Sequence, residues 1–310
     1  MSEDWRLLGE GVIIQSVPRL VKQHRVNAAL PEERTLYGSS MQQFIDFMSN
    51  YERVLRQLFY EFGVTWNDVY QNSDVGKERL MLADRMDIDQ DDVVLDVGCG
   101  RGFFTIAAAH KAKFVTSLDL MNGLGRKGWW QRFKLTMRKL QLNNRVAGAK
   151  GNAATMPFRD KTFDVTSSVH AIRNFQDITT IQGAFREMKR VTKKGGRVIV
   201  VETLPSARNK AQEAHIKVFN CKVKYNQGEL SYLTEEELTD LLKSVGLRIS
   251  KIKKTDFNLS VAPPYFLFNV ANVPEEQRAE AVREYNEAVE AIKKYGETSP
   301  PTLIAEAAAE

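Results

Sequence analysis

The stretch VVLDVGCGRGFFTIAAA, residues 93–109, decides the fold of the chain. It opens on a short apolar run, Val93 to Val97, of the kind found in strands that are buried on both faces. Beyond three glycines it continues as an apolar pattern with helical spacing. We therefore predict a strand, a tight turn and a helix. Such a turn points the N–H groups of a helix N-terminus at a negatively charged or hydrogen-bonding ligand group, and Gly98, Gly100 and Gly102 permit its close approach.

The composition is that of a soluble globular protein, with 310 residues of which 43% are hydrophobic and 27% are charged. No stretch approaches the roughly 18 uninterrupted apolar residues of a membrane span. The N-terminus MSEDWRLLGEG has neither a basic nor an apolar signal region, and we expect a cytoplasmic protein. Cys99 and Cys221 are the only cysteines, which is too few for a four-thiolate zinc site. We expect no metal.

Predicted strands and helices alternate from residue 91 onward, which indicates an α/β fold. We expect a Rossmann-like, mostly parallel sheet of seven strands with helices on both faces. An N-terminal helical extension, residues 1–74, precedes it, and a helical insertion, residues 274–296, precedes the last strand. Thr234 and Glu237 form a capping box that marks the clearest helix start. The strands are expected at residues 93–97, 114–118, 146–150, 163–169, 197–202 and 247–253, and within SPPTLIAEAAA.

An acidic residue near the end of the second predicted strand supports nucleotide binding. Asp119 lies 21 positions after Gly98, a spacing at which an acid binds ribose hydroxyls in doubly wound sheets. The turn reads G-x-G-x-G, with Phe103 where a dinucleotide loop places its third glycine. Asp96, directly before the turn, repels a pyrophosphate but attracts an ammonium group. A cofactor with a nucleoside at one end and an amino acid at the other satisfies both features, and S-adenosylmethionine is such a cofactor.

Residues 75–255 resemble the class I S-adenosylmethionine-dependent methyltransferases. VVLDVGCGRG is similar to their first motif, SLDL to their ribose-binding acid, GNAATMPFRDKTFDV to their adenine loop and fourth strand, and AFREMKRVTKKGGRVIVVE to the following helix, turn and fifth strand. HAIRNFQDITTIQGAFREMKRVTKKGGR is similar to the ubiquinone/menaquinone C-methyltransferase (methyltransferase type 11) branch, in which LRN follows the fourth strand. The resemblance implies a methyltransferase domain over residues 75–310, with residues 1–74 as an extension or lid.

The resemblance also implies the residues that bind the cofactor. Asp96 and Gly98 would meet the methionine end, Asp119 the ribose, and Asn152 with Ala153 the adenine. The family usually has aspartate where this chain has Asn152, so the amide oxygen keeps the acceptor but loses the charge assistance. Residues 1–74 also lack the opening motif of the quinone enzymes. The other cofactor positions that the resemblance implies are Cys99, Gly100, Gly102, Leu120 and Ser168.

Candidates for contact with the methyl acceptor follow the fourth and fifth strands. His170 lies at the sheet edge where α/β folds bind ligands, and it is a candidate general base because histidine titrates near neutrality. A histidine that only lines the pocket is the alternative. Arg173 and Asn174 match the family motif and either orient the substrate or brace the loop. The remaining candidates, for which core packing is the alternative, are Tyr37, His215 and Tyr225.

Residues 126–142, RKGWWQRFKLTMRKLQL, combine six basic side chains with an apolar stripe at helical spacing. Three interpretations remain open. The segment is a solvated face whose aromatic side joins the sheet, or a membrane-surface contact that collects a lipid-like substrate, or a nucleic-acid platform. An acidic protein partner would use the same charges. The net charge of the whole chain, +5, is too small to decide between them.

Three functional hypotheses follow from the resemblance. The first is in-line methyl transfer to a small-molecule or lipid-like acceptor, for which positioning of the reactants supplies up to roughly 7–11 kcal/mol. The second is transfer to protein or RNA, and the third is a non-catalytic S-adenosylmethionine-binding protein. The N-P-P-Y-type tetrad of amide and base methyltransferases is absent from the fourth strand, TSSVHAIRNF, which weighs against the second. The acceptor and the oligomeric state stay open at this point.

Overall fold

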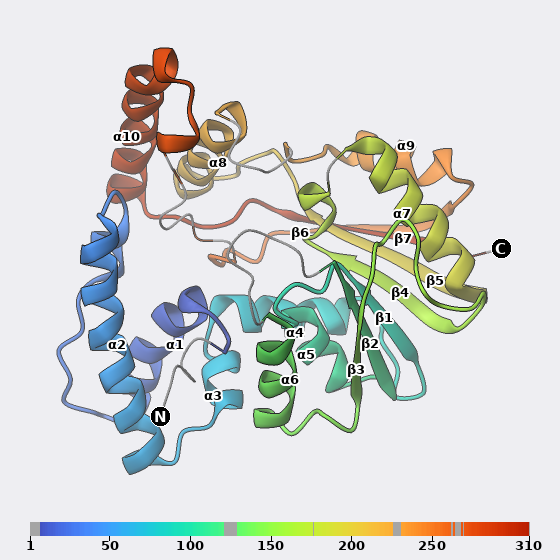
Figure 1. Ribbon diagram of the computed structural model, residues 1–310, viewed down its shortest axis with the longest axis horizontal. Helices are drawn as coiled ribbons and strands as arrows, with labels where there is room; N and C mark the ends of the chain where they lie inside the picture. Colours follow the sequence, from blue (N-terminus) through green and yellow to red (C-terminus); the bar gives the residue numbers. More distant parts are fainter. Residues whose placement is uncertain are drawn as a thin grey trace. The chain divides into compact units, whose positions relative to one another are not determined.

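A computed structural model of the chain describes residues 7–120, 129–175, 177–225, 231–261, 263, 268 and 270–309. The chain divides into two compact units, and both are drawn in Figure 1. The first unit contains Met1–Glu78, Ser206–Ser231 and Phe257–Pro300. The second unit contains Arg79–Pro205, Tyr232–Asp256 and Pro301–Glu310. The chain therefore passes between the units several times.

The second unit is built on a seven-stranded sheet in the order β3-β2-β1-β4-β5-β7-β6. The pairs from β3 through β5 are parallel, and β7 runs antiparallel to both β5 and β6. The seven-stranded, mostly parallel sheet confirms the predicted fold class. The strands are β1 (Val93–Val97), β2 (Phe114–Asp119), β3 (Val146–Lys150), β4 (Phe163–Val169), β5 (Thr192–Thr203), β6 (Arg248–Thr255) and β7 (Thr302–Ala308).

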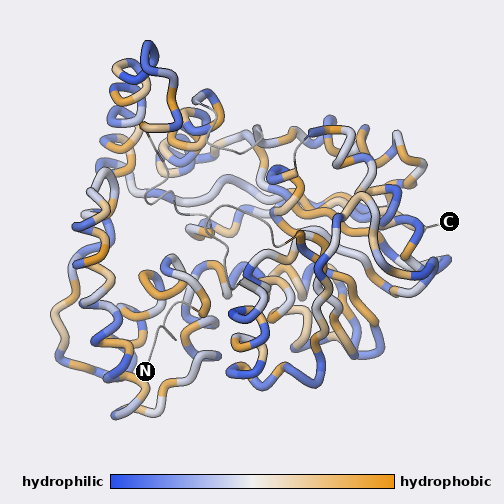
Figure 2. The backbone as a smooth tube through the Cα atoms, in the orientation of Figure 1, coloured by the Kyte–Doolittle hydropathy of each residue, from blue (hydrophilic) through white to orange (hydrophobic). Residues whose placement is uncertain are grey.

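Helices cover both faces of this sheet for a topological reason. The chain steps from β1 to β2 to β3 in one direction along the sheet and from β4 to β5 in the other. Because crossovers between parallel strands are right-handed, the connecting helices of the two halves lie on opposite faces. The central strands are buried between these layers and are apolar, as the hydropathy colouring shows (Figure 2). The helical segments of this unit are α5 (Phe103–Ala109), α6 (Trp129–Lys139), η3 (Ile172–Asn174), α7 (Ile178–Val191) and α9 (Glu235–Ser244).

The first unit is helical in its described residues. Ser40 and Thr65 cap α2 and α3, each through a capping box with the residue three positions later. In this unit α8 packs against α10, and the buried residues between them include Cys221 and Ala281. The segments are α1 (Glu10–Gln23), η2 (Glu33–Leu36), α2 (Met41–Phe62), α3 (Trp66–Gln71), α8 (Lys210–Lys224), η4 (Val270–Asn272), η5 (Glu275–Gln277) and α10 (Arg278–Tyr295), while α4 (Asp74–Arg85) continues from this unit into the second.

Several predicted strand boundaries differ from the structure. β2 ends one residue later than expected, and β6 begins one residue later and ends two residues later. β5 begins at Thr192, five residues before the expected start at residue 197, because Thr192 already pairs with Phe163, ahead of an irregularity in the ladder. The division expected at residue 74 stays a prediction; the compact unit that contains Met1–Glu78 also contains Ser206–Ser231 and Phe257–Pro300. Among the described residues, no helix is both long enough and apolar enough to cross a membrane.

Candidate cofactor and acceptor site

The site lies at the point where the sheet reverses its strand order. β1 and β4 are neighbours in the sheet, and their connections leave in opposite directions, so a crevice for ligands is expected beyond their carboxyl ends. The glycine turn follows β1, and the loop that begins at His170 follows β4. A Cβ placed on Gly98 would lie 2.7 Å from the Cβ of Ala171. The two loops are therefore in contact.

All three turn glycines have left-handed backbone conformations, with φ of 72° at Gly98, 51° at Gly100 and 81° at Gly102. Their surroundings differ. A Cβ on Gly102 would collide with the side chains of Phe133 and Met137 at 2.7 and 2.8 Å, whereas a Cβ on Gly100 would meet no described atom within 4 Å. Gly102 therefore serves the packing of α6, and Gly100 lies at the open side of the turn.

Asp119, at the carboxyl end of β2, binds directly to the glycine turn. Its Oδ2 accepts a hydrogen bond from the Gly100 N–H over 2.8 Å. The N–H groups of Gly98 and Cys99 donate to the Leu118 carbonyl over 2.8 and 3.1 Å. The acid that was predicted to bind ribose thus lies beside the turn that was predicted to bind the rest of the cofactor.

Asp96 is buried below the turn, with 2% of its surface exposed. Its Oδ2 accepts a hydrogen bond from the Thr105 hydroxyl over 2.6 Å, and Thr105 also contacts the Ser117 hydroxyl at 2.8 Å. Burial raises the pKa of Asp96 to about 6, and the charge of Asp119 acts in the same direction. The hydrogen bond from Thr105 and the charge of Arg79 lower the pKa but do not cancel this rise. The carboxyl therefore changes its charge within the pH range of ordinary assays.

Three further predicted cofactor residues surround the turn. Burial raises the pKa of the Cys99 thiol, as do the charges of Asp96 and Asp119, so this thiol stays protonated and non-nucleophilic at neutral pH. Ser168 is fully buried in β4, and its hydroxyl has no hydrogen-bond partner among the described residues. Leu120 follows Asp119 and is 50% exposed, which leaves an apolar side chain available to cover a flat ring.

The predicted adenine loop is held by its own side chains. The amide oxygen of Asn152 accepts a hydrogen bond from the Ala154 N–H over 2.8 Å, so the amide also shapes the turn that contains Ala153. The Met156 N–H donates to Glu187 over 2.6 Å, and Arg190 donates to Glu187 and to the Met156 carbonyl. Asn152 is exposed at the tip of this braced loop, and a carbonyl oxygen has a second lone pair for a ligand.

His170 adopts a left-handed conformation, with φ of 51°, directly after β4. Its Nδ1 lies 3.3 Å from the Thr203 hydroxyl at the end of β5. Glu202, the residue before Thr203, is buried, and its Oε1 accepts a hydrogen bond from the Ile172 N–H over 3.0 Å. The end of β5 therefore holds both the ring of His170 and the loop that follows it. Sequence reasoning missed Glu202 and Thr203.

Arg173 and Asn174 extend from the same loop. The guanidinium of Arg173 lies 5.4 Å from the ring centre of Tyr232, within cation–π range. Asn174 is exposed, and its N–H donates to the Ala171 carbonyl. Tyr232 was also missed by sequence reasoning, because it precedes α9 at a distance of 59 residues from Arg173 along the chain.

The other acceptor candidates belong to the first unit. Nδ1 of His215 is hydrogen-bonded to Oε1 of Glu297, whose Oε2 is bonded to the Ser260 hydroxyl, and both ionisable side chains are buried. Burial raises the pKa of Tyr37, and the charge of Glu297 adds to this effect. Tyr225 instead donates to Glu284 over 3.1 Å. Of the three candidates, the structure associates Tyr37 and His215 with one carboxylate and Tyr225 with another.

Glu297 belongs to a buried group of ionisable side chains that joins all three segments of the first unit. Asp74 is ion-paired with Arg19 at 2.5 Å and accepts from the Ser260 N–H over 3.1 Å. Burial raises the pKa of Glu33 to about 7, helped by the charges of Glu297 and Asp74 and opposed by Arg19. No three His, Cys, Asp or Glu side chains among the described residues are placed to hold a metal ion. The hydrogen bonds and ion pair of this group link the segments.

The aromatic side of α6 packs on the sheet. A Cβ on Gly148 of β3 would lie 2.1 Å from the Trp130 ring, so glycine is required for this ring to approach the strand so closely. Trp130 and Phe133 are stacked at 5.5 Å between ring centres, and Phe133 and Met137 are buried. Residues 126–128 and the Trp129 side chain lie outside the described part of the chain.

Comparison with known proteins finds similarity to methyltransferases. Residues 95–200 match the model of the methyltransferase domain family. A demethylmenaquinone methyltransferase of Alkalihalophilus pseudofirmus is 34% identical over 123 residues, which are 38% of this chain and 48% of that protein. The corresponding protein of Anoxybacillus flavithermus is 27% identical over 194 residues, which are 57% of this chain and 78% of that protein. In the first of these matches the chain spans about half the length of its relative.

Solved structures share the fold. A cyclopropane-fatty-acyl-phospholipid synthase-like protein of Lactobacillus casei superposes with a TM-score of 0.60 at 15% identity, covering 78% of this chain and 92% of that one. The YcgJ protein of Bacillus subtilis superposes with a TM-score of 0.55 at 18% identity, covering 76% and 99%. Residues 95–200 of the chain therefore match a methyltransferase domain, and the chain is similar in sequence to demethylmenaquinone methyltransferases.

Proposed function

We propose that the protein transfers the methyl group of S-adenosylmethionine to a small-molecule or lipid-like acceptor. One observation carries the proposal most directly. Asp119 accepts a hydrogen bond from Gly100, so the predicted ribose-binding acid and the predicted cofactor turn lie side by side. They lie beyond the carboxyl end of β1, next to the strand-order reversal, where open α/β sheets bind nucleotides.

The residues of the second unit fit the cofactor in chemical type. The carboxylate of Asp119 suits ribose hydroxyls, the ionised form of Asp96 suits an ammonium group, and the Asn152 amide with the exposed Leu120 suits an adenine ring. When bound, S-adenosylmethionine supplies an electrophilic methyl group on a positively charged sulfur. The roles of Cys99, Gly100, Gly102, Ala153 and Ser168 as further contacts belong to the same proposal.

His170 is the proposed proton acceptor on the acceptor side. Its Nδ1 is held near the Thr203 hydroxyl, which fixes the ring orientation and directs Nε2 to the opposite side of the ring. A general base in this position assists methylation when the attacking oxygen, nitrogen or activated carbon must lose a proton. Arg173, stacked near Tyr232, places a positive charge on the same loop, and we propose that it orients the acceptor together with Asn174.

A lipid-like acceptor is supported by the relatives, whose name states that they methylate demethylmenaquinone. Transfer to protein or RNA is the second candidate, and a non-catalytic cofactor-binding role is the third. The lid role of residues 1–74, the acceptor contacts of Tyr37, His215 and Tyr225, and a cytoplasmic location remain predictions from the sequence.

Transfer of a labelled methyl group separates these candidates. The purified protein is incubated with methyl-labelled S-adenosylmethionine and, separately, with a lipid extract, a protein pool and an RNA pool. We expect label in the lipid fraction and its loss in His170→Asn. Label in protein or RNA alone would support the second candidate. Cofactor binding without label in any pool would support the third.

A further inference from the structure

One edge of the sheet in the second unit presents an excess of positive charge. β3 is the edge strand and α6 lies beside it. Residues 129–150, which contain both elements, carry six basic residues and no aspartate or glutamate. We name this region the β3 edge surface. Its basic residues are Arg132, Lys134, Arg138, Lys139, Arg145 and Lys150.

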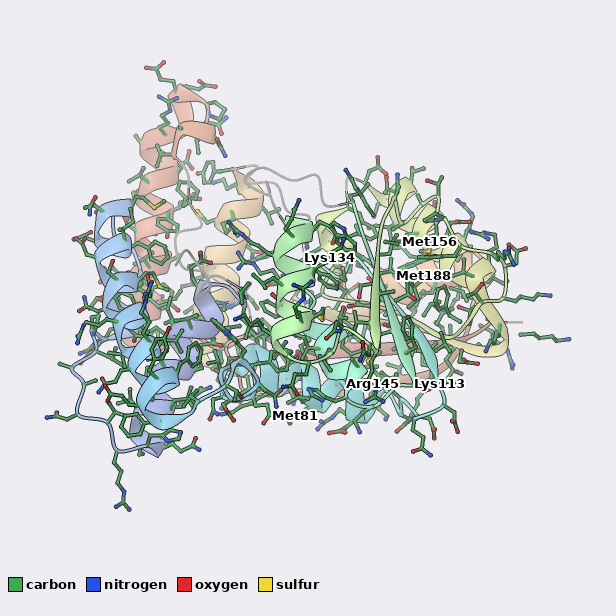
Figure 3. The ribbon with its side chains drawn as sticks, turned by 60° about the horizontal axis from the view of Figure 1, so that its bottom comes forward. Met81, Lys113, Lys134, Arg145, Met156 and Met188 are labelled. Atoms are coloured by element: carbon green, nitrogen blue, oxygen red, sulfur yellow. The ribbon has the colours of Figure 1, made fainter. Side chains whose placement is uncertain are left out.

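These charges point away from the sheet. The packing of Trp130, Phe133 and Met137 against β3 and the glycine turn fixes which side of α6 faces inward. The remaining side of the helix carries the charges, and all six basic residues except the half-buried Arg132 are exposed. Figure 3 labels Lys134 on α6, and Arg145 and Lys113 near one another at the strand ends (Figure 3). The basic surface therefore continues past the helix onto the turns before β2 and β3.

The opposite edge of the same sheet is also rich in lysine, but its charges are neutralised locally. Lys251 and Lys253 of β6 lie 2.9 and 3.9 Å from Asp87. Lys254 is ion-paired with Glu235. Residues 129–150 contain no acidic residue, so any counter-charge for the β3 edge surface has to come from outside its own segment.

We infer that the β3 edge surface docks the protein on the anionic headgroups of a phospholipid membrane. Each Lys or Arg near an anionic bilayer strengthens binding about fivefold, so a surface of this size is sufficient for reversible attachment. The inference rests on the proposed lipid-like acceptor for its purpose, since attachment would bring the enzyme to the phase in which such an acceptor dissolves. The attachment itself requires neither cofactor nor acceptor.

The packing of the aromatic rings favours a membrane over a nucleic acid. Single-stranded nucleic acids bind to basic grooves in which exposed aromatic rings stack on the bases. Here the Trp130 ring lies against Gly148 and Phe133 is buried, so the aromatic rings of α6 described in the structure do not form a stacking platform on the charged side. The same packing means that attachment is electrostatic, without insertion of these rings into the bilayer.

Sedimentation with phospholipid vesicles tests the inference. The full chain, without cofactor, is mixed with phosphatidylcholine vesicles that contain or lack phosphatidylglycerol. We expect binding to the anionic vesicles only, and its loss on addition of salt. In the variant Lys134→Gln/Arg138→Gln/Lys139→Gln the binding constant should fall about 100-fold. The matched control Lys251→Gln/Lys253→Gln/Lys254→Gln removes the same net charge from the opposite edge and should lose less than about fivefold.

Equal losses in the two triple variants would overturn the inference, because net charge alone would then explain the binding. It would also be overturned by wild-type protein that binds RNA but not anionic vesicles, or binds neither. Thermal unfolding and titration with S-adenosylmethionine establish that both variants remain folded. Vesicle binding without methyl transfer to any pool would contradict the proposed function alone, and methyl transfer without vesicle binding would contradict the docking surface alone.

Discussion

The Gly100 N–H donates to Asp119 Oδ2 over 2.8 Å, and this contact makes one site from two strand ends. Gly100 follows β1 and Asp119 ends β2. Since the strands are parallel neighbours, their carboxyl ends meet at the same edge of the sheet. The contact also uses an N–H that the turn would otherwise leave to solvent or ligand. The proposed cofactor site is thus organised by hydrogen bonds within the chain.

The glycines of the turn differ in what a side chain would cost. Gly100→Ala adds a methyl group in open space and should lower the free energy of unfolding by about 1–2 kcal/mol, the cost of a left-handed alanine. Gly98→Ala has the same backbone cost and adds a collision with Ala171 at 2.7 Å, for a total of about 2–4 kcal/mol. Urea denaturation of both variants measures the difference. Equal losses of unfolding free energy in the two variants would show that the glycine turn and the loop after β4 are not packed together as described.

Cofactor affinity should depend on the charge of Asp96. Its pKa is raised to about 6, and only the ionised carboxylate attracts an ammonium group. Binding of S-adenosylmethionine should therefore strengthen between pH 5 and pH 7, around that pKa. The isosteric Asp96→Asn should bind more weakly at pH 7 and lose this pH dependence, which calorimetry at several pH values measures. An unchanged pH dependence in the variant would place the ammonium elsewhere.

The variant His170→Asn removes the proposed general base and is compatible with the backbone conformation at this position. Asparagine tolerates the left-handed conformation that His170 adopts, so the loop should keep its shape. Loss of a general base typically slows transfer by about 10²–10⁴-fold, while cofactor affinity should stay within a factor of about two. The rate of labelled methyl transfer and a cofactor titration are the two measurements. Full activity in the variant would make His170 a residue that only lines the site.

The stability of the first unit should fall as the pH rises. The pKa of Glu33 is raised to about 7 from a usual value of 4.5, first by burial and then by Glu297 and Asp74. A raised carboxyl pKa contributes stability that is present below the unfolded pKa and is lost as pH rises through the folded one. Glu33→Gln should therefore be more stable than wild type at pH 8, by up to about 3 kcal/mol.

Thermal unfolding of wild type and Glu33→Gln between pH 5 and pH 8, on either side of that pKa, makes this measurement. Glu61→Gln, an exposed carboxylate on α2, is the matched control and should follow the wild-type curve. A Glu33→Gln curve with the wild-type slope would mean that Glu33 is ionised throughout this range.

The sequence predicted the sheet well where a strand is defined locally. β1, β3 and β4 match their predicted bounds, because each is a short segment that local turn residues delimit. The glycine turn between β1 and α5 is confirmed for the same reason, since its residue types and spacing define it locally; the cofactor role of Asp119 stays a prediction. The capping box of Thr234 and Glu237 is confirmed. These features depend on neighbours within a few positions.

The features that the sequence did not predict depend on residues far apart in the chain. His215 and Glu297 are separated by 82 positions, and no local pattern pairs a buried histidine with one particular glutamate. The assembly of the first unit from three segments is of the same kind. Thr105 left a partial signal, a hydroxyl inside the apolar helix FFTIAAA, but its partner Asp96 was assigned only to the ligand. Such pairs are decided by tertiary packing.

The central claim is that the turn after β1 and Asp119 together bind S-adenosylmethionine. A calorimetric titration of the purified protein with S-adenosylmethionine, S-adenosylhomocysteine and NAD tests it, repeated on Asp119→Ala and on Asp240→Ala, a surface carboxylate of α9. We predict saturable binding of the two adenosyl ligands, weakened about 10- to 100-fold in Asp119→Ala by loss of a charge-assisted hydrogen bond, and unchanged in Asp240→Ala. Binding of NAD alone, or equal affinity in all three proteins, would contradict the account.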